Sequence, residues 1–151
     1  MFSRILCPID FDSNSLEALR MARRMAEQNK ARLYVLHVVL PADPMVISAP
    51  IIAQRTAEQA WAELHKISDT ELIGIDYEIL LRFGHPAKEI VAAETAMNAE
   101  LVVMATHGRT GISHLVLGSV AEKVVRESSC PVLTVHMKAH PVAEEVKQTA
   151  A

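Results

Sequence analysis

Cysteine is scarce in this 151-residue chain: Cys7 and Cys130 lie far apart, and no CxxC pair is present. That pattern favours a reduced, cytoplasmic protein in which both cysteines pack as small apolar side chains, rather than one with a reactive thiol. Net basic charge is lacking as well, and a formal net charge of −3 disfavours nucleic acid as a partner. Because no apolar run is long enough for a membrane span and residues 1–4 do not resemble a signal peptide, we expect no membrane contact.

The common nucleotide and hydrolase signatures are also missing. Without GxxxxGK[ST] the chain is not a P-loop NTPase, and without GxGxxG after the first strand it lacks the dinucleotide fingerprint. No GxSxG elbow surrounds a serine and no HExxH or HxxxH pair lies on a helix. We therefore expect no catalytic residue and no metal ligand, although His37, His107 and His114 could in principle approach one another.

What the chain does contain is a regular alternation of strand and helix patterns. Half the residues are hydrophobic and 22% are charged, as in a single compact domain. Strands are predicted at 5–9, 33–39, 77–81, 101–105 and 131–135, and helices within 16–26, 53–64, 86–97 and 117–124. This order predicts an α/β fold: an open five-stranded parallel sheet, doubly wound, with helices on both faces. The last strand has no crossover after it and is expected at a sheet edge.

Several helix boundaries can also be predicted. Asp12, Ser13 and Asn14 offer caps for the first helix, and Asn14 with Glu17 fits a capping box. Pro86 suits the first position of the third helix, where its missing N–H is not needed. The second helix is expected to fray near 68–69, and its Trp61 is expected in the core or in an interface.

Leu101–Val125 carries the strongest functional signal. An apolar strand passes through a loop with Gly108 into a helix that opens on Gly118-Ser119. Glycines let backbone N–H groups approach an anion, and a helix N-terminus adds unpaired donors and the positive end of its dipole. The stretch therefore predicts a phosphate site at the carboxyl end of the sheet, where such folds bind ligands. The alternative is that the glycines only shape the turns.

The same stretch, together with four shorter segments, resembles the universal stress protein family. The shorter segments are Pro8-Ile9-Asp10, His37-Val38, Gly84-His85-Pro86 and Pro131-Val132-Leu133. The resemblance covers about 1–137, which we take as the universal stress protein domain, and leaves 138–151 as a polar tail. It implies a Rossmann-like fold of the adenine nucleotide alpha hydrolase type.

ATP-binding members of that family share the pattern Gly-x2-Gly-x9-Gly-Ser/Thr. Here Gly108-x9-Gly118-Ser119 is intact, but Ala105 stands in place of the first glycine. Its methyl group would crowd the ribose or constrain the turn out of the strand. Because alanine is the smallest replacement, we expect weakened rather than abolished binding.

The resemblance implies binding roles for twelve residues, with ATP, alone or with Mg²⁺, as the ligand. Those implied around the adenine and ribose are Pro8, Ile9, Asp10, Val38, Met104 and Ala105. Those implied around the phosphates are His107, Gly108, Arg109, Gly118, Ser119 and Val120. Asp10 also has a second interpretation, as a strand-end residue that caps the first helix.

Together these patterns predict a cytoplasmic universal stress protein that binds ATP and acts as a sensor or regulator in stress response, with at most slow hydrolysis. One alternative is a family member that binds no nucleotide and works by protein–protein contacts, which Ala105 favours. Another is a slow ATP hydrolase or a transferase. ATP pyrophosphatases are excluded, because the turn after the first strand lacks their glycines. A homodimer through 131–136 is expected from the resemblance, unless the tail folds over that strand.

Overall fold

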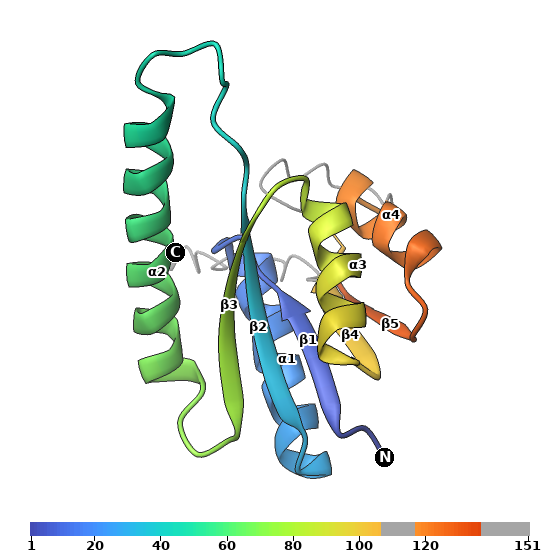
Figure 1. Cartoon of the computed structure of the whole chain (residues 1–151). Coiled ribbons are helices and arrows are strands. Elements are labelled where there is room, and N and C mark those ends of the chain that lie inside the picture. Colours follow the sequence, from blue (N-terminus) through green and yellow to red (C-terminus); the bar gives the residue numbers. More distant parts are fainter. Residues whose placement is uncertain (107–116, 137–151) are drawn as a thin grey trace, which may run out of the picture.

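The computed structural model describes residues 1–106 and 117–136. Five strands alternate with four helices in the described part of the chain (Figure 1). The strands are β1 (Arg4–Pro8), β2 (Arg32–Val39), β3 (Tyr77–Phe83), β4 (Leu101–Ala105) and β5 (Val132–Val135). The helices are α1 (Ser13–Asn29), α2 (Ala49–Glu71), α3 (Pro86–Met97) and α4 (Ser119–Glu127). The predicted tail, 138–151, lies outside the described residues.

The strands form one parallel sheet in the order β3-β2-β1-β4-β5. The predicted fold class is thus confirmed, and β5 lies at an edge as expected. The order reverses at β1: the chain first winds outward through β2 and β3, then crosses to β4 on the other side. Parallel sheets bind ligands at such a switch point, beyond the carboxyl ends of the strands. In this protein that point lies between β1 and β4.

Each face of the sheet has its own core, because successive side chains of a strand point to opposite faces. Ile5 and Cys7 of β1 pack with Leu19 of α1 and Leu64 of α2. Leu6, between them, packs on the other face with residues of α3 and α4. Burial raises the pKa of the Cys7 thiol, which is fully enclosed. The helices α1 and α2 therefore cover one face, and α3 and α4 cover the other.

The start of α1 differs from the predicted capping box. Asp12 is the N-cap, and its Oδ1 accepts from the Ser15 amide at 2.7 Å. Asn14 already lies inside the helix, and Glu17 pairs with Arg20 instead of reaching back to a cap. An N-cap carboxylate accepts from the amide three residues further along the chain. Asp12, directly before the first helical residue Ser13, does this with the Ser15 amide.

The second helix is longer than predicted at both ends. It begins at Ala49, four residues ahead of the predicted start at residue 53, and continues to Glu71 without fraying at 68–69. Ile67 and Ser68 are buried against the sheet, and the Ser68 hydroxyl donates to the His65 carbonyl at 2.8 Å. Tertiary packing therefore stabilises a helical end that local propensity leaves weak.

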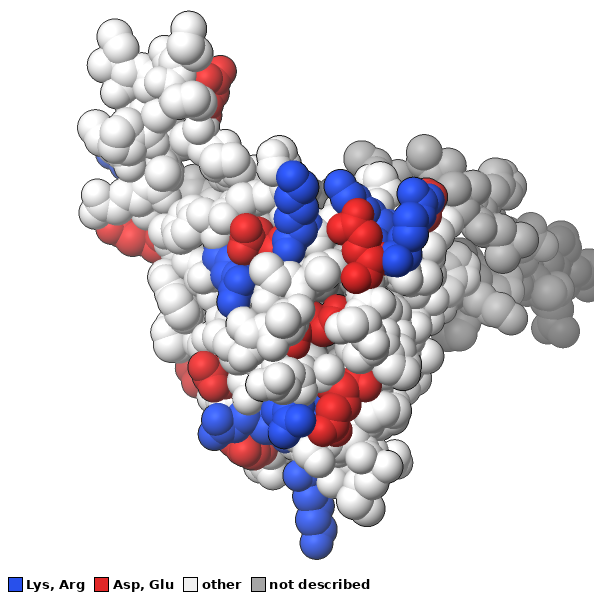
Figure 2. All heavy atoms as spheres, turned by 45° about the vertical axis from the view of Figure 1, so that its right-hand side comes forward, with Lys and Arg blue, Asp and Glu red and all other residues white. Residues whose placement is uncertain are grey.

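On the face shown in Figure 2, Lys and Arg lie interspersed with Asp and Glu, and no single-sign stripe crosses it. Within residues 1–106 and 117–136, the structure contains no helix that is both long and apolar enough to cross a membrane.

Candidate functional site

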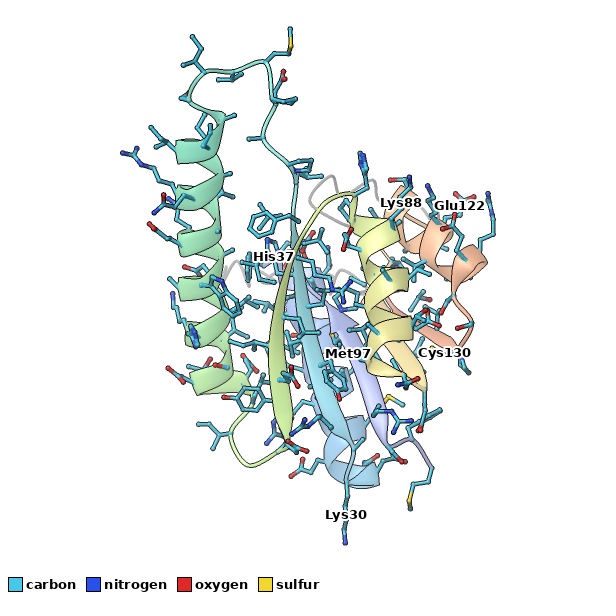
Figure 3. The ribbon with its side chains drawn as sticks, in the orientation of Figure 1. Lys30, His37, Lys88, Met97, Glu122 and Cys130 are labelled. Carbon is cyan, nitrogen blue, oxygen red and sulfur yellow. The ribbon has the colours of Figure 1, made fainter. Side chains whose placement is uncertain are left out.

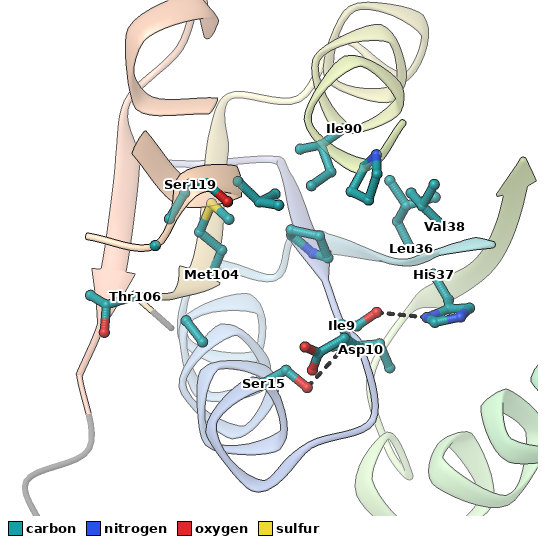
Figure 4. A pocket seen from close by; sticks show the side chains of 16 residues that line it. Ile9, Asp10, Ser15, Leu36, His37, Val38, Ile90, Met104, Thr106 and Ser119 are labelled. Carbon is teal, nitrogen blue, oxygen red and sulfur yellow. Dashed lines mark hydrogen bonds between the residues drawn. The ribbon is translucent and has the colours of Figure 1, made fainter. Parts of the chain in front are cut away.

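A pocket of about 290 Å³ opens at the carboxyl ends of β1, β2 and β4, where the strand order reverses. Its walls come from the β1–α1 turn, the end of β2, the first turns of α3 and α4, and the end of β4 (Figure 4). Elements that are far apart in the sequence meet here because parallel strands bring their carboxyl ends to one side of the sheet.

Nine of the twelve residues proposed for binding line this pocket. They are Pro8, Ile9, Asp10, Val38, Met104, Ala105, Gly118, Ser119 and Val120. The other three, His107, Gly108 and Arg109, lie outside the described residues. The structure thus brings the β1, β2, β4 and α4 groups together, as a shared site requires.

The turn between β1 and α1 separates the roles of its two carboxylates. Asp12 caps α1, whereas Asp10 lines the pocket. The Asp10 amide donates to the Ser15 hydroxyl and the Asp10 Oδ1 accepts from the Asp12 amide, both at 3.2 Å. The second interpretation of Asp10, as the cap of the first helix, is therefore wrong. Burial, aided by the nearby Asp10 carboxylate, raises the pKa of Asp12 even though the Ser15 amide donates to it.

His37 on β2 contacts this turn (Figure 4). Its Nδ1 donates to the Ile9 carbonyl at 2.8 Å, and its ring lies 4.2 Å from the Phe11 ring, centroid to centroid. Phe11 has a φ of 68°, a left-handed conformation that is costly for a bulky residue. The ring contact and the hydrogen bond hold the turn in the shape that places Asp10 at the pocket.

The opposite wall of the pocket is the N-terminus of α4. Gly118 is the N-cap, and its own amide donates to the Thr106 carbonyl at 2.7 Å, which ties the helix start to the end of β4. The amides of the first helical turn have no acceptor within their helix, and glycine has no side chain to cap them. Gly118, Ser119, Val120 and Ala121 all line the pocket. This wall therefore offers backbone donors and the positive end of a helix dipole.

The two walls differ in charge. Asp10 contributes a carboxylate on the α1 side, and no lysine or arginine belongs to the described lining. Between the walls lie mostly apolar groups, with Ile90 of α3 and Met104 of β4 among them. A ligand that fits would present hydroxyl or amino donors to Asp10, an apolar ring system to the middle, and an anion to α4.

The structure shows which of the two expected effects of Ala105, crowding of the ribose or a constrained turn, its backbone allows. This residue pairs with Val135 inside the parallel ladder and does not have a positive φ. The backbone therefore does not require glycine at this position. Of the two effects considered for the substitution, only the methyl group in the pocket wall remains.

Seven lining residues were not among the sequence-predicted site residues. They are Ser15, Leu36, His37, Pro86, Ile90, Thr106 and Ala121. A sequence signal was available for His37, which lies near the end of the second strand in the segment His37-Val38. Pro86 also lay in a segment singled out from the sequence, Gly84-His85-Pro86, whereas Ile90 had no such signal, because helical spacing does not show which side chains of a helix face a pocket. In the part of the chain that is described, no group of three His, Cys, Asp or Glu side chains is placed to hold a metal.

Comparisons with known proteins agree with this geometry. A family model described as the universal stress protein family matches residues 1–136. Universal stress protein MJ0531 of Methanocaldococcus jannaschii is 34% identical over 143 residues, which span 89% of this chain and 82% of that protein. The solved structure of hypothetical protein MJ0577 superposes with a TM-score of 0.83 at 27% identity, over 93% of this chain and 99% of the other. A universal stress protein in complex with cAMP superposes with a TM-score of 0.73 at 24% identity, over 91% and 99%.

Proposed function

The chain belongs to the universal stress protein family, and from that premise we propose that it binds an adenine nucleotide, ATP above all, in the pocket between β1 and β4. The observation that carries the proposal is the polarity of this pocket. A carboxylate lies on one wall, a helix N-terminus lies on the opposite wall, and apolar side chains lie between them. A nucleotide carries the matching groups, which are hydroxyl and amino donors, a flat ring and an anion.

In this proposal each wall recognises one part of the nucleotide. Asp10 accepts from the ribose hydroxyls or the adenine amino group, since an ionised carboxylate only accepts. Val38 and Met104 contact the adenine, and the amides of Ser119 and Val120 donate to phosphate oxygens. The cAMP complex of a family member supports this class of ligand.

We further propose that the protein works in the cytoplasm as a sensor or regulator in stress response rather than as a fast enzyme. His37, which lines the described part of the pocket, donates through Nδ1 to the Ile9 carbonyl, and its ring lies tilted against the Phe11 ring. That arrangement gives it a role in shaping the turn. Fast hydrolysis needs a base placed against the attacking water. Because His37 is engaged with the turn instead, we expect any ATP hydrolysis to be slow.

ATP titrated calorimetrically into the purified protein is expected to bind, and Ala105→Gly is expected to bind it more tightly. Removing the methyl group relieves a crowded wall, an effect of about 1 kcal/mol, or roughly fivefold in Kd. Ala105→Val should weaken binding, since it adds bulk at the same place. Mass spectrometry of the supernatant after denaturation would identify any nucleotide that copurifies.

The same titration decides between this proposal and the family member that acts by contacts alone. No heat with the wild type or with Ala105→Gly would contradict nucleotide binding and favour that second function. Turnover of ATP well above background would instead favour the hydrolase.

We also propose a homodimer through 131–136, because β5 has no strand paired on its outer side within residues 1–106 and 117–136. The Pro131 carbonyl accepts from the Val102 amide and the Val135 carbonyl accepts from the Thr106 amide. The alternation along the strand therefore turns the Thr134 amide away from β4. Thr134→Pro removes that outward donor without removing a β4 bond. Thr134→Pro is expected to halve the molar mass measured by light scattering, because the contact through β5 is lost. Thr134→Val is expected to keep the wild-type mass. Equal masses for wild type and Thr134→Pro would contradict the edge pairing.

A further inference from the structure

An apolar projection, separate from the pocket, extends beyond the carboxyl ends of the strands. It comprises residues 40–55, which form the β2–α2 connection and the first turns of α2; we call it the 40–55 arm (Figure 1). Its large apolar side chains are exposed: Leu40, Met45, Val46, Ile47, Ile51 and Ile52. Met45 is 89% exposed and Ile47 is fully exposed. A cluster of this kind on a protein surface marks a contact site.

Hydrogen bonds give the arm a defined shape. The Asp43 Oδ1 accepts from the Met45 amide at 2.9 Å, and the Asp43 carbonyl accepts from the Val46 amide at 3.1 Å. The Ala49 amide then donates to the Val46 carbonyl at 2.9 Å, directly before α2. A preformed apolar surface loses little conformational entropy on association.

The charges of the arm lie at its two ends. Residues 44–54 contain no charged side chain, Asp43 precedes them and Arg55 follows them. In Figure 2 the projecting part at the upper left is accordingly mostly white. Neither Asp43 nor Arg55 forms an ion pair within residues 1–106 and 117–136.

We propose that the 40–55 arm pairs with the same arm of a second copy of this chain about a two-fold axis, with Asp43 of each copy facing Arg55 of the other. The exposed apolar side chains then meet each other, and the two charges that flank them in the sequence have opposite partners. An isologous contact requires this self-complementarity.

A lipid surface fits the arm less well. No lysine or arginine occurs between residues 33 and 54, whereas segments that lie on membranes usually carry basic residues that attract anionic lipids. The self-pairing also leaves β5 accessible, because β5 and β3, the strand next to α2, lie at opposite edges of the sheet. Pairing through both sites would join more than two chains.

Charge exchange tests the pairing, with association followed by sedimentation equilibrium. Asp43→Arg places two arginines opposite each other and is expected to weaken the arm contact roughly 10-fold or more, and Arg55→Asp should do the same with two acids. The double variant Asp43→Arg/Arg55→Asp should regain the wild-type association. An equimolar mixture of the two single variants should associate although neither does alone.

Apolar substitutions provide the second measurement and its control. Ile47→Asp leaves the folded monomer undisturbed, because Ile47 is fully exposed, but should abolish the arm contact. Ile73→Asp changes another exposed isoleucine, 67% exposed and outside the arm, and should leave the mass unchanged. Circular dichroism confirms that each variant is folded. An unchanged mass for Ile47→Asp, or a double variant that fails to recover, would overturn the proposal. A membrane role would also overturn it. In that case the wild type would float with phosphatidylcholine vesicles, Ile47→Asp would not, and the two proteins would have the same mass in solution.

Discussion

Glu94→Ala is expected to lower the free energy of unfolding by about 2–4 kcal/mol, because it leaves buried donors without an acceptor. Glu94 on α3 is only 1% exposed. Its Oε1 accepts from the Ser129 amide at 2.8 Å, the Ser129 hydroxyl at 2.6 Å and the Cys130 amide at 3.1 Å. Its Oε2 accepts from the Ser128 hydroxyl at 2.6 Å. One carboxylate thus anchors the connection between α4 and β5, in which Cys130 is labelled in Figure 3.

The Glu94 contribution should disappear in acid. Burial by itself would raise the pKa of this carboxyl, but the hydrogen bonds from Ser128, Ser129 and Cys130 outweigh it and lower the pKa below its ordinary 4.5. A group with a lowered folded pKa stabilises fully above its unfolded pKa and loses that effect as the pH falls through the folded value. Urea unfolding of wild type between pH 6 and pH 3 should therefore show a loss of stability below about pH 4.5 that Glu94→Gln lacks.

A matched variant separates this buried carboxylate from an ordinary one. Glu122 on α4 is exposed and pairs with Arg126, so Glu122→Ala should change stability by no more than about 0.5 kcal/mol. Parallel pH curves for wild type and Glu94→Gln would contradict the assigned role. So would equal losses for the two alanine variants at neutral pH.

Asp10→Ala is expected to weaken ATP binding roughly 10- to 100-fold, the loss of one or two hydrogen bonds to an ionised acceptor. Its neighbour Asp12 provides the matched control, since Asp12 caps α1. Asp12→Ala should lower the free energy of unfolding by about 1 kcal/mol and leave the affinity nearly unchanged. Calorimetric titration and urea unfolding of both variants measure the two effects separately.

Asp10→Asn distinguishes charge from shape at the same position. The asparagine keeps an oxygen that can accept from the Asp12 amide, as Asp10 Oδ1 does, but removes the negative charge. We expect an affinity between those of wild type and Asp10→Ala. If Asp10→Ala and Asp12→Ala weakened ATP binding equally, the effect would lie in the shape of the turn, and direct recognition by Asp10 would be contradicted.

The fold was predictable because its signals are local. Apolar runs and helical spacing mark the elements, and their strict alternation leaves a parallel sheet as the economical arrangement. The residue that caps α1 could not be predicted, because Asp12, Ser13 and Asn14 all suit an N-cap. The choice follows from the turn that Phe11 makes in its left-handed conformation.

The residues of the pocket also fall into those that the sequence predicted and those that only the structure shows. Its β1 and α4 walls were predictable because short motifs, Pro8-Ile9-Asp10 and Gly118-Ser119, end a strand and open a helix. Pro86 belongs to the segment Gly84-His85-Pro86 but received no binding role, and Ile90 belongs to no motif, so only the packing of α3 on the sheet shows that both line the pocket. Glu94 follows the same rule: a glutamate in an amphipathic helix is usually solvated, but here the α4–β5 connection covers it.

The sequence by itself therefore determined the order of the elements, the parallel sheet with β5 at its edge, and most of the groups that line the pocket. These follow from periodicity and from motifs whose members lie close together in the chain. The tertiary structure decided which aspartate caps α1, that Ala105 lies in the pocket wall without a positive φ, and that the 40–55 arm projects from the body with its apolar side chains exposed. Each of these depends on contacts between residues distant in the sequence, or on their absence, and local patterns carry no record of such contacts.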